Sequence, residues 1–317
     1  SDLVRWYGAP IGGLNLANNC VDVTVWPAPQ PSAPAMWSIW PPTPAAIVQN
    51  NCVSAPGLRT TPGLGRRPGT FELVLSGKVG ERSELQAVSV HDPVTFAATA
   101  IRQHLADAGI TIAGDIRYER VRTLLGDVPG DVTILDRHRT PLASVLQRVG
   151  TDSQNMCAEA IFKRLGWNWA REHGDYDSPG SWSNGREAVS AFLISIGCDL
   201  NTITIADGSG LSRSNRATAT EFVHILEHMY NHPRRELFIG SLAGSRTGGT
   251  LRRLRDFDGE VYAKTGYMSG VRALSGYVHS QSDRWYAFSV IFNGFVGTSR
   301  PYYNKSIELC RILSNDS

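Results

Sequence analysis

The sequence predicts an α/β fold in which an antiparallel sheet is flanked by helices and is preceded by a β-rich region. Three observations support this prediction. Strand-like and proline-dense segments fill roughly the first ninety residues. Segments with helical periodicity and helix start signals fill the middle of the chain. Three strand-like runs and a closing helix make up the C-terminal end, and helices next to antiparallel strands form a layered domain.

The N-terminal region alternates as strands do in CVDVTVWP (20–27) and again in FELVLSGKV (71–79). The prolines between these runs favour edge strands and turns over helix interiors. The first clear helix is expected to begin after Asp92, an N-cap residue followed by proline, and to end at Gly109.

A polar stretch at 118–133 predicts a domain boundary. We therefore expect residues 1–117 to form a β-rich module and residues 118–317 to form the α/β domain. In that domain SQNMCAEAIFKRLG has an apolar helical stripe, with Ser153 at the N-terminal edge of the helix.

Two further helices are predicted from pairs with the spacing of a capping box. The pairs are Asn184 with Glu187 and Thr218 with Glu221. Strands follow in EVYAKTG, VRALSGYVHS and RWYAFSVIFN, with a hairpin connection at SQSD (280–283), and a last helix starts near Pro301.

Composition excludes several classes of function. The net charge is +2 with 19% charged residues, which does not favour a nucleic-acid partner or an anionic membrane surface. No apolar run approaches the roughly 18 to 20 residues of a membrane span, and the first residues do not have the pattern of a signal peptide. The five cysteines form no C-x-x-C pair, so unpaired cysteines are favoured, with a Cys20–Cys52 bridge as the alternative.

Lys264 is one of four lysines in the chain, and Thr265 and Gly266 follow it at the end of a strand-like run. An ammonium, a hydroxyl and a residue without a side chain are suited to holding a substrate carboxylate close to a strand. By itself this K-T-G sequence is a weak signal.

Ser153, Gln154 and Asn155 form the one S-x-N sequence of the chain. A hydroxyl can relay a proton and an amide can bind a peptide carbonyl, so this pair also has the chemistry of a site. Taken alone, an N-cap role for Ser153 is the simpler interpretation.

The segment HILEH (His224 to His228) matches the H-x-x-E-H spacing of zinc proteases. Both histidines are expected on the solvent side of the helix, with no third ligand indicated, opposite a buried side formed by Phe222, Ile225, Leu226 and Met229. We therefore expect no metal site and no cofactor.

Taken in order, these segments resemble the class C low-molecular-mass penicillin-binding proteins, which are D-alanyl-D-alanine carboxypeptidase/endopeptidases of the S13 peptidase family. The resemblance includes S-x-N, K-T-G and the stretches PLASVLQRVGTDSQNMCAEAIFKRLG, ADGSGLSRSNRATATEF and YAKTGYMSGVRALSGYV. It extends over nearly the whole chain, because YGAPIGGLNLANNCVDVTVWP is similar to the accessory region of that family. It implies a serine β-lactamase/transpeptidase-like fold with a β-rich inserted accessory domain.

The resemblance also implies an activity and roles for residues. The activity is serine-type acyl transfer on the D-Ala-D-Ala end of peptidoglycan stem peptides, outside the cytoplasm (periplasm or cell-wall side), with β-lactams as ligands. Ser153 would relay a proton, Asn155 would bind the acyl-side amide, and Lys264 with Thr265 would bind the terminal carboxylate. The remaining substrate-binding positions would be Gly266, Tyr267, whose N–H would form part of an oxyanion hole, and Met268.

The sequence departs from that family in two places. Gln154 stands where the family usually has aspartate, at the least critical position of the motif. More important, no S-x-x-K sequence is present, since no serine stands three residues before any of the four lysines. We expect the nucleophile to lie in a segment before residue 1, so that this chain alone is inactive. The alternative is a non-catalytic protein that binds peptidoglycan peptides.

Overall fold

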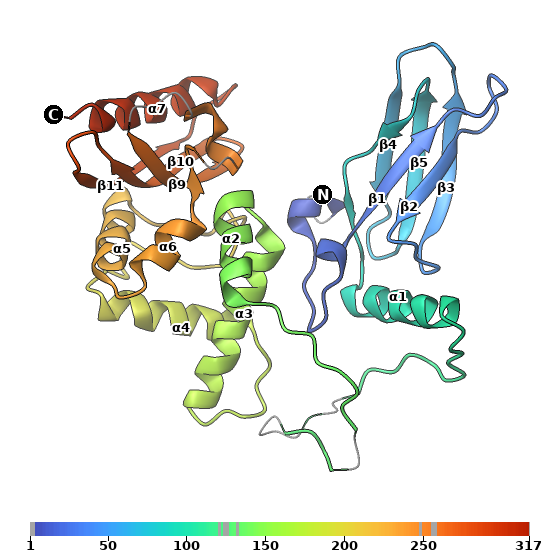
Figure 1. Ribbon diagram of the computed structural model, residues 1–317, viewed down its shortest axis with the longest axis horizontal. Coiled ribbons are helices and arrows are strands. Elements are labelled where there is room, and N and C mark those ends of the chain that lie inside the picture. The colour runs from blue at the N-terminus through green and yellow to red at the C-terminus, as the bar shows by residue number, and fades with distance from the viewer. Residues whose placement is uncertain are drawn as a thin grey trace. The chain divides into compact units, whose positions relative to one another are not determined.

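The computed structural model describes residues 4–119, 122, 127–130, 133–246, 249–254 and 259–316. Contacts between residues divide the chain into two compact units, residues 1–121 and residues 122–317. Each unit, drawn as a ribbon in Figure 1, has a hydrophobic core of its own according to which side chains are buried together. Half of the predicted boundary stretch 118–133 lies outside the described residues.

Within its described residues, the first unit contains two small sheets, one α-helix and the short 3-10 turns η2 and η3. The elements are η2 (Trp6–Gly8), η3 (Ala17–Asn19), β1 (Cys20–Trp26), β2 (Met36–Trp40), β3 (Ile47–Ser54), β4 (Thr61–Arg66), β5 (Glu72–Val79), β6 (Ser83–Glu84), β7 (Val88–Ser89) and α1 (Pro93–Asp107). One sheet has the order β2-β1-β6, with β7 also paired to β1, and all its pairs are antiparallel. The other has the order β3-β5-β4, in which β3 is parallel to β5.

Alternation along the strands explains how this unit forms a core. Val21, Val23 and Val25 of β1 are buried together with Leu73 and Leu75 of β5, because side chains of one strand point alternately to opposite faces. The β-rich character predicted for the N-terminal region is therefore confirmed.

Helix α1 begins and ends as its sequence predicts. The Asp92 carboxylate accepts hydrogen bonds from the backbone N–H groups of Val94 and Thr95, and Gly109 has a φ of 80° just beyond the helix. Phe96 of α1 packs into the core of the strands.

The second unit consists of a four-stranded sheet with helices on both faces (Figure 1). The elements are α2 (Leu142–Asp152), α3 (Asn155–Glu172), α4 (Trp182–Ser195), α5 (Ala219–Asn231), α6 (Arg235–Ser241), β8 (Ala243–Gly244), η4 (Gly249–Leu254), β9 (Glu260–Met268), β10 (Val271–His279), β11 (Trp285–Asn293) and α7 (Arg300–Ser314). The sheet order is β11-β10-β9-β8 and every pair is antiparallel. The three predicted strands, the hairpin connection and the last helix are confirmed.

The two faces of this sheet bury different side chains. Val261 of β9 packs with Cys310 of α7 on one face. Tyr277 of β10 packs with Leu226 of α5 and Ile239 of α6 on the other. Because side chains alternate along a strand, Lys264 lies on the face opposite Val261, towards the helices that precede the sheet.

Two of the predicted helix starts need correction. Helix α4 begins at Trp182, and Ser181 rather than Asn184 is its N-cap, accepting a hydrogen bond from the Asn184 N–H at 3.1 Å. The N-cap of α3 is Gln154, so the interpretation of Ser153 as an N-cap is wrong. The N-cap of α4 lies three residues before the predicted position and that of α3 lies one residue after it, a difference that the spacing of polar residues alone does not distinguish.

All five cysteines are buried and unpaired. The Cys20–Cys52 bridge, considered as an alternative, is therefore not formed. Cys52 instead donates a hydrogen bond from its thiol to the carbonyl oxygen of Ser76 at 3.1 Å.

Candidate active site

The predicted site is centred on a contact between β9 and the junction of two helices. The Lys264 ammonium donates hydrogen bonds to Oγ of Ser153 and, at 3.0 Å, to the backbone oxygen of Thr265. The structure therefore brings together two residues that lie 111 positions apart in the sequence. The S-x-N and K-T-G segments are therefore in contact.

Burial alters the chemistry of this lysine. Removal from water lowers the pKa of Lys264 from 10.5 to about 8, because an ammonium loses solvation in the interior. Among the described residues, no carboxylate forms an ion pair with it. A cation without a counter-charge of its own is suited to bind an anion supplied by a ligand.

Ser153 has an unusual backbone conformation at the junction. It is the C-cap of α2, with φ 57° and ψ 42°, and a backbone N–H of this cap donates a hydrogen bond to the carbonyl oxygen of Arg148 in α2. A left-handed residue costs a non-glycine side chain about 1–2 kcal/mol, and it turns the chain sharply from α2 into α3. The turn directs the Ser153 hydroxyl to Lys264 and places Asn155 at the first position of α3.

Close packing of α2 holds that junction in place. A Cβ atom on Gly150 would lie 1.9 Å from the backbone oxygen of Ser241, so only glycine allows α2 to approach the end of α6 this closely. The Thr151 hydroxyl lies 3.4 Å from the same oxygen.

The rest of the predicted substrate-binding segment continues along β9. Thr265, Gly266, Tyr267 and Met268 pair in register with residues 271 to 274 of β10. The side chain of Tyr267 is 65% exposed, whereas the other three residues are partly buried. These positions form an accessible strand next to Lys264.

A loop that the sequence marks by DGSG (207–210) is held near this strand. The Asp207 carboxylate accepts hydrogen bonds from the N–H groups of Gly210 at 2.7 Å and Ser212 at 2.6 Å. Arg213, further along the loop, donates to the backbone oxygen of Ser269 in the β9–β10 turn at 3.2 Å. The loop and the end of β9 are thus joined.

Glu159 of α3 fastens the start of that loop, a role that the sequence did not indicate. Its carboxylate accepts hydrogen bonds from the N–H groups of Gly208 at 3.2 Å and Ser209 at 3.0 Å, and from the indole of Trp182 at 2.8 Å. The Lys163 ammonium lies 3.7 Å from the centre of the Trp182 ring. The one available signal was that Glu159 lies one helical turn after Asn155, on the same face.

Among the described helices, none combines the length and apolar character needed to cross a lipid bilayer.

Comparison with known proteins identifies relatives of the chain. The family model described as "D-Ala-D-Ala carboxypeptidase 3 (S13) family" matches residues 1–314. A D-alanyl-D-alanine carboxypeptidase of Actinomadura sp. (strain R39) is 31% identical over 312 residues, covering 92% of this chain and 55% of that protein. The carboxypeptidase DacB of Mycolicibacterium smegmatis is 29% identical over 219 residues, covering 66% of this chain and 46% of that protein.

A solved structure shares the fold. Penicillin binding protein 4 (dacB) of Haemophilus influenzae superposes with a TM-score of 0.77 at 20% identity, over 99% of this chain and 70% of that chain. The predicted fold class and the family resemblance are confirmed. The chain spans about half the length of the curated relatives it matches.

Proposed function

The chain belongs to the D-Ala-D-Ala carboxypeptidase 3 (S13) family, and from this premise we propose that its protein is a serine-type D-Ala-D-Ala carboxypeptidase/endopeptidase acting on peptidoglycan stem peptides. The observation that best supports the proposal is the hydrogen bond from Lys264 to Ser153. It unites the two motif segments in a site with a buried cation and a hydroxyl.

Each residue of the site has a role in this proposal. The Lys264 ammonium and the Thr265 hydroxyl bind the terminal carboxylate of the peptide. Ser153, which accepts a hydrogen bond from Lys264, passes a proton towards the leaving amine. Asn155 binds the amide on the acyl side, and the backbone N–H of Tyr267 donates to the developing oxyanion. Gly266 and Met268 border the bound peptide.

The nucleophile is the part of this mechanism that the chain does not supply. No S-x-x-K sequence is present, and acyl transfer by this family type requires a serine that attacks the carbonyl carbon. We propose that the chain binds substrate without hydrolysing it when it is alone. The alternative is a protein whose function is to bind peptidoglycan peptides.

Partners and location follow from the proposed substrate. The structure of Haemophilus influenzae penicillin binding protein 4 has been solved in complex with a β-lactam, and we propose that β-lactams are also ligands of this site. Peptidoglycan stem peptides lie outside the cytoplasm, so the site acts there. The unit of residues 1–121 then serves as the accessory module of the enzyme.

A labelled penicillin tests these statements directly. The chain alone is incubated with a fluorescent penicillin and analysed by denaturing electrophoresis, beside the same protein extended by its own upstream coding sequence. We expect label on the extended protein and none on the chain alone. Label on the chain alone would overturn the missing-nucleophile proposal, and an extended protein that binds D-Ala-D-Ala peptide but takes no label would favour the binding protein.

A further inference from the structure

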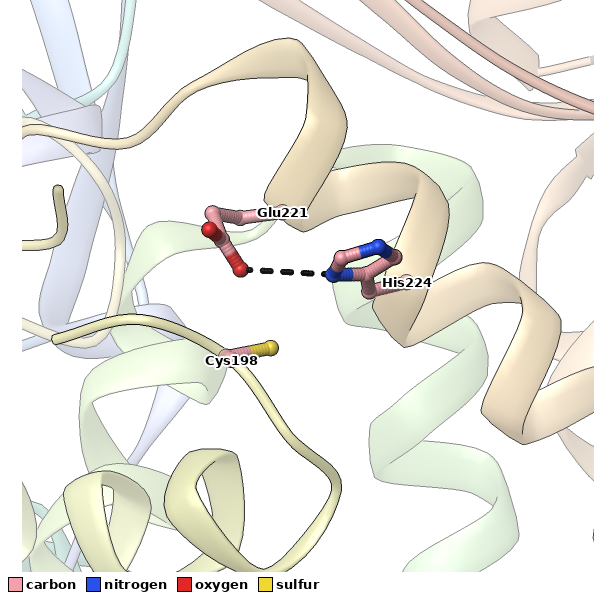
Figure 2. Close-up of side chains that lie close together, drawn as sticks. All are labelled: Cys198, Glu221 and His224. Atoms are coloured by element: carbon pink, nitrogen blue, oxygen red, sulfur yellow. Dashed lines mark ion pairs between the residues drawn. The ribbon is translucent and has the colours of Figure 1, made fainter.

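A second polar cluster lies in the same unit, away from Lys264. Cys198, Glu221 and His224 each place one potential ligand atom within 4.8 Å of the other two (Figure 2). Glu221 and His224 come from the first turns of α5, and Cys198 lies on the segment that follows α4. Nothing in the proposed carboxypeptidase chemistry uses this cluster.

Local structure explains why the three side chains meet. Gly197 has a φ of 87°, its N–H bonds to the oxygen of Ile194, and the N–H of Cys198 bonds to the oxygen of Leu193. These two bonds form a Schellman motif, which fixes Cys198 just beyond α4. Glu221 and His224 are three residues apart on α5 and therefore share one face of the helix.

One carboxylate oxygen of Glu221 lacks a hydrogen-bond partner among the described residues. The residue is 6% exposed, and its Oε1 accepts a hydrogen bond from the Thr202 hydroxyl at 3.2 Å. Its Oε2 has no hydrogen-bond partner among the described residues, and Nδ1 of His224 lies 3.7 Å from it. A buried carboxylate oxygen without a hydrogen bond costs free energy, and the cation that the described residues offer it is His224 when protonated, at 3.7 Å. A metal ion bound between the two side chains would satisfy this oxygen more fully.

We propose that Cys198, Glu221 and His224 bind a divalent transition-metal ion of the zinc class. A thiolate sulfur, a carboxylate oxygen and an imidazole nitrogen are the three ligand types that zinc takes in proteins. Bond lengths of about 2.0–2.3 Å place tetrahedral ligand atoms roughly 3.3–3.7 Å apart. The 3.7 Å between Oε2 of Glu221 and Nδ1 of His224 is a few tenths of an ångström longer than the roughly 3.3–3.5 Å that an oxygen and a nitrogen ligand need, and Cys198 has to move by about 1 Å at most.

An open hollow next to the cluster allows a metal ion to enter. This hollow has a volume of about 600 Å³ and is lined in part by Gly197, His224 and His228. The side chain of His224 is 46% exposed, so one ligand faces solvent and two are buried. Three protein ligands and a solvent-facing side leave the fourth tetrahedral position for water.

This ligand set differs from the H-x-x-E-H interpretation of the sequence. His224 belongs to both sets. The proposed site otherwise uses Cys198 and Glu221, whereas the H-x-x-E-H spacing uses Glu227 and His228. The ring of His228 lies beside Phe192 and His232, with ring centres 5.7 and 5.6 Å away. His228 is therefore a suitable control for histidine-dependent metal binding.

Metal binding releases the proton of the Cys198 thiol. Burial, with a smaller contribution from Glu221, raises the pKa of the Cys198 thiol to about 11. The bound metal takes the thiolate, so the thiol proton leaves to solvent. The inference is independent of the proposed carboxypeptidase activity.

Cobalt(II) titration tests the site. The chain is stripped with a chelator, dialysed under reducing conditions and titrated with cobalt chloride while its absorption spectrum is recorded. We expect one equivalent to bind, with thiolate-to-cobalt charge transfer in the near ultraviolet and visible bands typical of tetrahedral cobalt, and zinc to displace it. Absence of saturable binding overturns the proposal.

Variants assign the ligands. Cys198→Ala should abolish the charge-transfer band, and His224→Ala should weaken cobalt binding by more than about 10- to 100-fold, since even substitutions behind a ligand cost that much. The control His228→Ala should bind as the parent does. Survival of the band in Cys198→Ala, or an equal loss in His228→Ala, overturns the assignment.

A measurement of thermal stability distinguishes the loss of a metal ligand from a failure of the variant to fold. Zinc should raise the thermal unfolding midpoint of the parent and of His228→Ala, because a ligand that binds only the native state stabilises it. It should leave the midpoint of His224→Ala unchanged, and this half-exposed residue can be replaced with little effect on packing. A midpoint that rises equally in His224→Ala overturns the proposal.

Discussion

The end of β9 and the first turns of α5 each hold a charged group that the fold removes from water. Lys264 in β9 has hydrogen bonds from its ammonium to two oxygens, but no ion pair with a carboxylate among the described residues. Glu221 in α5 has one oxygen bonded to Thr202 and one without a hydrogen-bond partner in the same part of the chain. The two regions thus differ in the sign of the buried charge and in whether every polar atom of the charged group has a hydrogen-bond partner.

The difference indicates what each region binds. A buried charge that the protein does not pair lowers stability, and it persists where a ligand supplies the missing charge. By this reasoning the positive site at Lys264 is suited to a carboxylate, and the negative site at Glu221 to a cation. Neutralising each charge should therefore remove its ligand without harming the fold.

The largest expected effect is on peptide binding at β9. Lys264→Met keeps the length of the side chain and removes its charge. The dissociation constant for an N-acylated D-Ala-D-Ala peptide should rise by about 10- to 100-fold, because a hydrogen bond to a charged group contributes about 1.5–3 kcal/mol. Calorimetry or NMR titration of the chain measures it. Lys305→Met, on an exposed position of α7, is the control, and equal weakening in both variants would contradict the role of Lys264.

The same substitution should raise stability near neutral pH. A pKa of about 8 in the folded state against 10.5 when exposed corresponds to a cost of about 3 kcal/mol at pH 7. Loss of the bond to Ser153 offsets about 1 kcal/mol, so Lys264→Met should be about 2 kcal/mol more stable. Urea unfolding at several pH values measures this difference.

The pH dependence has a defined direction. Between pH 8 and 10.5 the unfolded lysine is protonated while the folded one is not, so the parent protein gains stability as pH rises. The advantage of Lys264→Met should therefore fade across this window. An advantage that stays constant from pH 7 to 10.5 would show that the folded pKa is not lowered.

A smaller effect is expected at α5. Glu221→Gln keeps the shape of the side chain and removes the charge whose Oε2 has no hydrogen-bond partner within the described part of the chain. In metal-free buffer, the free energy of unfolding should be unchanged or raised, by no more than about 1 kcal/mol. A loss well above 1 kcal/mol in chemical denaturation would mean that the Glu221 carboxylate is fully paired in solution. Glu221 would then not be an unpaired buried charge of the kind that Lys264 is.

An effect of similar size concerns the backbone of Ser153. Glycine adopts its left-handed conformation without strain, whereas alanine does not. Ser153→Gly should therefore be about 1 kcal/mol more stable than Ser153→Ala, while both lose the hydroxyl that Lys264 contacts. Equal stabilities in denaturant titrations would indicate that the αL conformation is not kept in solution.

Local features of the fold were predictable from the sequence. Asp92 and Thr218 cap their helices as predicted, because the capping oxygen and the N–H groups that it binds lie within three residues of each other. The strands at the end of the chain were also predicted, since an apolar run bounded by polar turn residues is visible within ten residues. Asn184 failed as a cap because Ser181, equally polar, stood one turn earlier.

The sequence by itself determined the family, the order of the layers and the motif residues Ser153, Asn155 and Lys264. Tertiary structure decided that Ser153 ends α2 in a left-handed turn, that Glu159 holds the loop at Gly208, and that Cys198 meets Glu221. The reason is physical: hydrogen bonds between near neighbours follow from a few adjacent residues. Contacts across 111 positions, such as Lys264 with Ser153, depend on how whole helices pack against the sheet.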